Sequence, residues 1–95
     1  MICMNIVLQV NQAADVETVR ALLTDAMRKS RQEPGCERFD VYHSQADASR
    51  FTLVEHWVSQ EALDAHRLAE AYTTIYKPQV IPLVDREGHP VTLLD

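Results

Sequence analysis

The sequence predicts an α+β domain of the ferredoxin-like kind, in which one antiparallel sheet carries its helices on a single face. Segments with strand periodicity and segments with helical periodicity follow one another in the order β-α-β-β-α-β, which is the split βαβ plan. The chain has 95 residues, enough for one hydrophobic core, so we expect a single domain over residues 1–95. Hydrophobic residues make up 46% of the chain and charged residues 24%, which is too apolar for a disordered protein.

Residues 3–10 predict the first strand because apolar side chains alternate with polar ones, so that one face is buried. A helix is predicted over residues 16–32, where apolar side chains return every three or four positions. Asp15 precedes this helix and can accept hydrogen bonds from the free N–H groups of its first turn. Pro34 and Gly35 end it, because the residue before a proline avoids the helical conformation and glycine accepts a positive φ.

Two more strands are predicted over residues 36–43 and 50–58, joined as a hairpin by the polar loop 44–49. One face of the later strand carries Phe51, Leu53, Glu55 and Trp57, and the opposite face carries Thr52, Val54, His56 and Val58. Both faces are largely apolar, whereas the chain has helices enough to cover only one face. We therefore expect the other face to meet a second copy of the chain in a homodimer.

The rest of the chain is predicted to form a second helix and a last strand. Ser59 is a good N-cap for this helix. Its inward stripe consists of Ala62, Leu63, His66 and Ala69. Residues 72–76 continue in helical character, and residues 79–84 fit a short helix or an extended stretch equally well. Gly88 is expected to turn the chain into the last strand over residues 90–94.

Charge and composition exclude several classes of function. The formal net charge is -5 and the Lys and Arg residues are scattered, so we expect no nucleic-acid partner. No apolar run approaches the ~18 residues of a membrane span, and the first residues lack the features of a signal peptide, so we expect a cytoplasmic protein. Cys3 and Cys36 lie far apart and outside any CxxC pattern, which favours buried thiols over a disulfide or a zinc site. The histidines fall on separate elements, and we expect no metal.

Several short motifs resemble those of the antibiotic biosynthesis monooxygenase family. They are the turn Glu33-Pro34-Gly35-Cys36, the strand motif Glu55-His56-Trp57, the helix cap Ser59 and the pair Ala65-His66. The resemblance extends over nearly the whole chain and is weakest in the first strand and after Pro78. It implies a homodimer whose two sheets face each other in a shared α/β barrel. It also implies a ligand pocket between the sheet and the helices of each subunit.

Family oxygenases act on quinols or phenols with dioxygen and need neither a metal nor a flavin, so the resemblance implies no cofactor. Such a reaction requires an apolar cavity and a base. Glu55 is the candidate base, because a carboxylate among apolar side chains loses hydration and its pKa rises. His66 is suited to proton transfer and faces the sheet. The alternative is that both are structural, with Glu55 paired to an arginine or to His66 and with His66 a hydrogen-bonded core residue.

Four further side chains are expected to line the pocket, namely Phe51, Leu53, Trp57 and Tyr72. Trp57 offers a flat surface on which an aromatic ring can stack, although a single tryptophan also commonly anchors a core. Tyr72 lies one helical turn from Tyr76, and either hydroxyl could orient a quinol oxygen or serve only in packing.

Two other functions remain open at this stage. The first is an isomerase of a small phosphorylated dione, a branch that the run from Arg38 to Val41 also resembles. It would need the same carboxylate and histidine, with Arg38 or Arg50 binding the phosphate. The second is a non-catalytic dimeric ligand-binding or stress-response protein. Haem degradation is disfavoured, because that branch uses a helix-borne histidine and residues 71–77 contain none.

Overall fold

The computed structural model describes all residues from 1 to 95. Its elements are β1 (Ile2–Val10), the 3₁₀ turn η1 (Ala13–Asp15), α1 (Val16–Ser30), β2 (Cys36–His43), β3 (Arg50–Trp57), α2 (Gln60–His66), the π-helical segment η2 (Ala71–Val80), the 3₁₀ turn η3 (Ile81–Leu83) and β4 (Val84–Val91).

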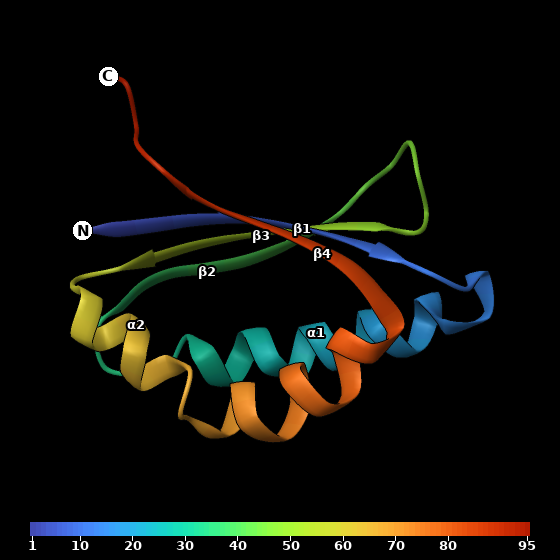
Figure 1. The fold of residues 1–95 in the computed structure, drawn as a ribbon, viewed down its shortest axis with the longest axis horizontal. Helices are drawn as coiled ribbons and strands as arrows, with labels where there is room; N and C mark the ends of the chain where they lie inside the picture. The colour runs from blue at the N-terminus through green and yellow to red at the C-terminus, as the bar shows by residue number, and fades with distance from the viewer.

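The four strands form one antiparallel sheet in the order β2-β3-β1-β4. β1 lies inside the sheet and pairs with β3 on one side and β4 on the other. In Figure 1 the sheet forms one layer, and α1, α2 and η2 form a second layer that covers one of its faces. This arrangement confirms the predicted ferredoxin-like α+β fold.

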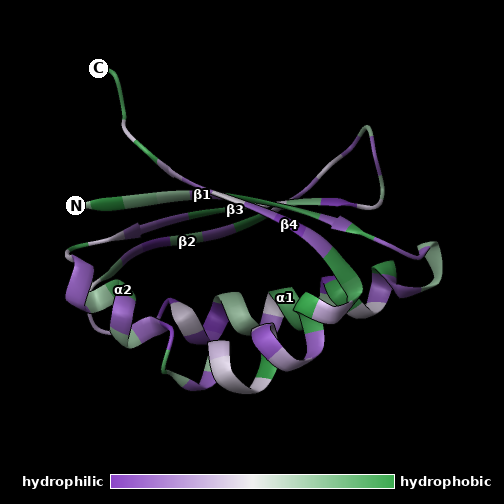
Figure 2. Ribbon diagram, in the orientation of Figure 1, coloured by the Kyte–Doolittle hydropathy of each residue, from purple (hydrophilic) through white to green (hydrophobic).

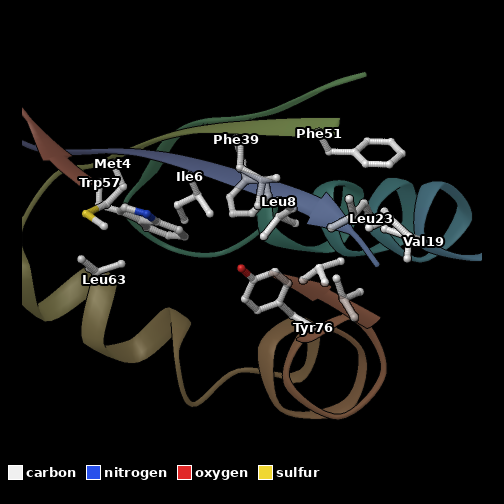
Figure 3. Close-up of a cluster of buried hydrophobic side chains, with 14 residues drawn as sticks. Met4, Ile6, Leu8, Val19, Leu23, Phe39, Phe51, Trp57, Leu63 and Tyr76 are labelled. Atoms are coloured by element: carbon white, nitrogen blue, oxygen red, sulfur yellow. The ribbon is translucent and has the colours of Figure 1, made fainter. Parts of the chain in front are cut away.

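The hydrophobic core fills the space between the sheet and the helices. Every second residue of β3 is buried, as the alternation of the sequence predicts, and Trp57 and Phe51 are at most 1% exposed. Figure 3 shows Trp57 and Met4 above Leu63 of α2, and Ile6 and Leu8 of β1 above Tyr76 of η2. Burial of these apolar side chains is the main force that holds the helical layer on the sheet.

The opposite face of the sheet carries no helix (Figure 1). Thr52, Val54 and His56 of β3 lie on this face and are only half-buried, and Tyr42 of β2 is 53% exposed. The expectation that a second copy of the chain covers this face stays a prediction.

α1 begins and ends close to the predicted positions. It alternates between hydrophobic and hydrophilic residues along its length (Figure 2) and ends at Ser30, two residues before the predicted end. Asp15 precedes it but makes no side-chain hydrogen bond to the first turn, so the predicted cap is wrong. Gly35 turns the chain with a φ of +82°, and a Cβ atom there would lie 2.6 Å from the Cβ of Ala62. Only glycine therefore fits this close approach of the turn to α2.

The helices after β3 follow the prediction more closely. The Ser59 hydroxyl accepts a hydrogen bond from the N–H of Ala62 at 3.2 Å, which confirms the N-cap of α2. Residues 79–84 are mainly helical, because η2 continues to Val80 and η3 follows it. η2 contains Pro78, which lacks a backbone N–H, within a widened helical segment. None of the helices combines the length and the apolar character that crossing a membrane requires.

The predicted position of the last strand is wrong. β4 begins at Val84 rather than at residue 90, and Gly88 lies inside the strand, opposite Ile6, rather than in a turn. Most of β4 is hydrophilic (Figure 2), so it has no apolar alternation from which a strand could be recognised. Charged residues and Pro90 are tolerated here because β4 is an edge strand, one side of which needs no partner.

Candidate functional site

A cavity lies between the sheet and the helices. Its walls are mainly apolar and include Met4, Ile6, Leu23, Phe39, Leu53 and Leu63. Its polar lining consists mainly of Glu55, His66, Arg67, Tyr72, Tyr76 and Arg86. The space open to the centre of a water molecule is about 20 Å³, which is room for about one water. An aromatic ring therefore enters only when lining side chains move, and the exposed Arg67 and the half-buried Tyr72 are the ones free to do so.

Glu55 projects from β3 into the cavity and is 4% exposed. The indole Nε1–H of Trp57 donates a hydrogen bond to its Oε1 at 3.1 Å. Burial raises the pKa of Glu55, and the Trp57 hydrogen bond and the nearby His66 oppose this rise only in part. The carboxyl group can therefore hold or release a proton at a higher pH than an exposed glutamate can.

His66 lies at the end of α2, where Leu63 also turns toward the sheet. Its Nε2 is 4.0 Å from Glu55 Oε1, and its Nδ1 is 2.7 Å from Glu33 Oε1. The sequence alone suggested a contact between Glu55 and His66, and the structure brings the two groups together just beyond hydrogen-bond distance. Because Glu33 occupies Nδ1, Nε2 is the nitrogen that remains available on the side of Glu55.

Glu33 is a residue of this site that the sequence-based search missed. Burial raises the pKa of Glu33 to about 7, and burial lowers the pKa of His66. Burial therefore favours the uncharged form of each group, with one proton shared across their 2.7 Å contact. Glu33 also lines a shallow surface groove with Lys29 and Glu70, so it joins solvent to the imidazole inside the cavity. In the sequence, Glu33 could be recognised only as part of the Glu-Pro-Gly-Cys turn, and this position in a motif does not by itself indicate a role in the site.

Of the four predicted pocket residues, the structure places Leu53 and Tyr72 on the cavity wall. Trp57 lies behind the wall, where its ring packs on His66 with the centroids 4.5 Å apart. Phe51 also lies outside the cavity and stacks on His43, with the centroids 4.2 Å apart. Trp57 therefore affects the cavity only by contacting its lining residues Glu55 and His66. Phe51 does not line the cavity.

Tyr76, whose hydroxyl the sequence also offered for orienting a quinol oxygen, lines the cavity, and Arg86 is a cavity residue that was not expected. The Nε–H of Arg86 donates a hydrogen bond to the Tyr76 hydroxyl at 2.9 Å. No carboxylate lies within 4.0 Å of the guanidinium of Arg86 or of Arg67. The cavity thus holds two cationic groups without an acidic partner at ion-pair distance.

Neither of the arginines considered for phosphate binding lines the cavity. Arg38 is held by Asp40 and Tyr42 on β2. Arg50 stands at the start of β3 and pairs with Gln9 of β1. Any anion in the cavity would therefore meet Arg67 and Arg86 in their place.

The remaining candidate groups form no site. No group of three or more His, Cys, Asp or Glu side chains is arranged to hold a metal ion. Cys3 and Cys36 are free thiols and are half-buried rather than fully buried. Burial raises the pKa of Cys36 to about 11, so its thiol stays protonated and weakly nucleophilic at neutral pH.

The fold and the cavity together define the class of protein. It is a ferredoxin-like α+β protein with a carboxylate and an imidazole buried under the helical layer. Residues 1–78 match the family described as antibiotic biosynthesis monooxygenase, and the chain belongs to that family. Arg86 and Gly88 lie beyond the matched residues.

Individual relatives agree with this assignment. Over 68 residues the chain is 40% identical to the "Putative monooxygenase Rv0793" of Mycobacterium tuberculosis, a match that covers 72% of this chain and 65% of that protein. The solved structure of Rv0793 superimposes with a TM-score of 0.86 at 28% identity, covering 100% of this chain and 97% of that one. A "Putative antibiotic biosynthesis monooxygenase" from Nitrosomonas europaea gives a TM-score of 0.90 at 25% identity, with full coverage of both chains.

Proposed function

We propose that the protein is a cofactor-independent monooxygenase that acts on a small quinol-like or phenolic molecule. The observation that carries this proposal is the buried carboxylate of Glu55, 4.0 Å from the imidazole of His66 in a cavity with mainly apolar walls. Membership of a monooxygenase family supports the class of reaction. Removal of a phenolic proton in an apolar cavity requires a base of raised pKa, and Glu55 meets that requirement.

In this mechanism Glu55 accepts the hydroxyl proton of the substrate, and His66 passes it on through Nε2. The phenolate then gives an electron to dioxygen. One oxygen atom bonds to a ring carbon, whose C–H becomes C=O, and the other atom leaves as water, so the substrate supplies all the electrons. The carboxyl and imidazole groups move protons only, and the apolar walls of Leu53 and its neighbours keep bulk water from the intermediate.

The same proposal includes a homodimer of one domain per chain. The half-buried, partly apolar sheet face around Val54 and His56 supports it, since no helix of the chain covers this face. A second copy seated there would leave the cavity open only between the sheet and the helices. A small aromatic substrate and dioxygen would enter by that route.

A second candidate function is the isomerisation of a small phosphorylated dione. The observation that favours it is the pair of guanidinium groups at the cavity, Arg67 and Arg86, without acidic partners at ion-pair distance. Glu55 and His66 would then move a proton beside a carbonyl instead of from a phenol. A non-catalytic ligand-binding protein would use the same cavity without turnover.

Oxygen uptake tests the proposal. The purified protein, free of metal and flavin, is supplied with hydroquinones and naphthoquinols and compared with boiled protein and with Glu55→Gln. Glu61→Gln is the matched control, because Glu61 is an exposed acid on α2 outside the cavity. We expect uptake that Glu55→Gln abolishes and Glu61→Gln retains, with the oligomer intact. Uptake that persists per folded subunit in Glu55→Gln would refute the catalytic role.

A further inference from the structure

The guanidinium of Arg86 is held at a defined place on the cavity wall. Arg86 pairs with Leu8 in the sheet, so its side chain leaves β4 on the face that the helices cover. The hydroxyl of Tyr76, which is buried on η2, accepts from its Nε–H at 2.9 Å. The end of the side chain lies over Gly88, two residues farther along the strand.

Gly88 provides the space for this position. A Cβ atom at Gly88 would lie 2.8 Å from Nη1, 2.9 Å from Nη2 and 3.0 Å from Cζ of Arg86. Any other residue at this position would push the guanidinium away from the sheet. Because Gly88 has no side chain, it leaves room for the guanidinium of Arg86 against the sheet.

The other hydrogen-bond donors of Arg86 have no partner in the protein. A guanidinium carries five N–H donors, and Arg86 uses only the one on Nε. The two Nη groups together form a planar fork that matches the two oxygens of a carboxylate or an ionised oxygen on a ring. No carboxylate of the protein lies within 4.0 Å of this fork, so it is free to bind one from a ligand.

The fork also lies at a useful distance from Glu55. Gly88 is opposite Ile6, which is opposite Leu53, and Glu55 is the next residue of β3 on the same face. Two strand spacings and two residues along the strand separate the Cα atoms of Gly88 and Glu55 by roughly 12 Å. Because the side chains of Arg86 and Glu55 both line the same cavity, one substituted aromatic ring can contact both of them.

We propose that Arg86, positioned by Tyr76 and Gly88, binds an ionised oxygen group of an aromatic ligand and so determines which substrates the cavity accepts. The proposal rests on the proposed function of the cavity and names its substrate class as a hydroxylated aromatic acid. The ring lies along Ile6 and Leu53, and the hydroxyl that reacts is the one at the Glu55 end. Arg67 is the other cation that the ligand meets at the cavity.

Binding tests this proposal without turnover. Isothermal titration calorimetry compares 2,5-dihydroxybenzoate with hydroquinone, two probes that differ by one carboxylate. The variants are Arg86→Gln, which removes the fork, and Gly88→Ala, which keeps the arginine but displaces its flexible end. Arg50→Gln is the matched control, because Arg50 is an exposed arginine of the same sheet outside the cavity. Urea unfolding and circular dichroism of each variant check that the fold is retained.

We expect the wild-type protein to bind the carboxylate probe more tightly than hydroquinone. Arg86→Gln and Gly88→Ala should weaken the carboxylate probe at least tenfold, as loss of a charge-assisted pair does, and change hydroquinone less than twofold. Arg50→Gln should change neither. Equal affinity of the wild type for the two probes, or the same loss in Arg50→Gln as in Arg86→Gln, would overturn the proposal.

Three further results separate this proposal from a phosphate site and from the proposed function. Dihydroxyacetone phosphate tests whether the anion is a phosphate instead of a carboxylate. Arg86-dependent binding of this probe in preference to both aromatic probes would overturn the assignment of an aromatic ligand. Arg86-dependent binding of the benzoate with no oxygen uptake would support the anion site and refute the oxygenase. Oxygen uptake with hydroquinone that Arg86→Gln leaves unchanged, together with equal binding of the two rings, would refute the anion site alone.

Discussion

Replacement of Glu33 by glutamine tests the pairing on which proton transfer at His66 depends. The change keeps the shape of the side chain and removes its negative charge beside His66 Nδ1, 2.7 Å away. A hydrogen bond to a charged group contributes about 1.5–3 kcal/mol, and one pKa unit corresponds to about 1.36 kcal/mol. The protonated imidazole therefore loses stabilisation equivalent to about 1–2 pKa units.

We expect the wild-type pair to take up its first proton near pH 7, because burial raises the pKa of Glu33 to about 7. In Glu33→Gln the midpoint of the His66 titration should fall by about 1–2 units, since burial already lowers the pKa of His66 and only the more distant Glu55 carboxylate, 4.0 Å from Nε2, remains to offset it. NMR titration of the ring signals measures this shift, and a His66→Asn variant assigns the signal.

Glu37→Gln is the matched control, because Glu37 is an exposed acid of β2 outside the cavity. It should leave the His66 midpoint unchanged. A midpoint in Glu33→Gln equal to that of the wild type would refute the coupling between the two groups. Proton transfer from Glu55 through His66 to the surface groove would then lack Glu33 as its last step.

Three further predictions concern stability and assembly. Gly35→Ala should lower the free energy of unfolding in urea by about 2 kcal/mol or more, because Gly35 has a positive φ and lies against α2. Gly88→Ala should change this free energy by about 1 kcal/mol or less, because the added Cβ meets only the flexible end of Arg86. Equal effects of the two substitutions would contradict the steric argument. The free energy of unfolding of the wild type should fall relative to that of Glu55→Gln as pH rises from 5 to 8. The folded-state pKa of Glu55 is raised, so Glu55 favours folding below its unfolded-state pKa, and this advantage is lost as pH rises through the folded-state pKa. Parallel pH profiles of the two proteins in urea unfolding would be the contrary result. Sedimentation at micromolar concentration should give the mass of a dimer, and a stable monomer would remove the argument from the two-faced sheet.

The sequence predicted most of the fold because local patterns and packing agree along β1, α1 and β3. Alternation along β3 identified the buried face from Phe51 to Trp57, and the N-cap Ser59 marked the start of α2. β4 was misplaced because it is held by backbone pairing to β1 rather than by an apolar face of its own. Its side chains between Val84 and Val91 are charged, polar or lack an apolar pattern, so no periodicity shows that they form a strand.

The same difference explains which parts of the site could be predicted. Glu55 and His66 were recognisable because each is a titratable residue on an apolar stripe, which is uncommon without a reason. Glu33 and Arg86 lie in a turn and on an edge strand, where charged residues are ordinary, so only the three-dimensional structure shows that Glu33 contacts His66 and that Arg86 lines the cavity. Both act at its boundary, with Glu33 between His66 and solvent and Arg86 over Gly88. Under the two proposals, the residues on the apolar stripes supply the proton chemistry of the reaction, and the boundary residues decide where the proton leaves and which ligand enters.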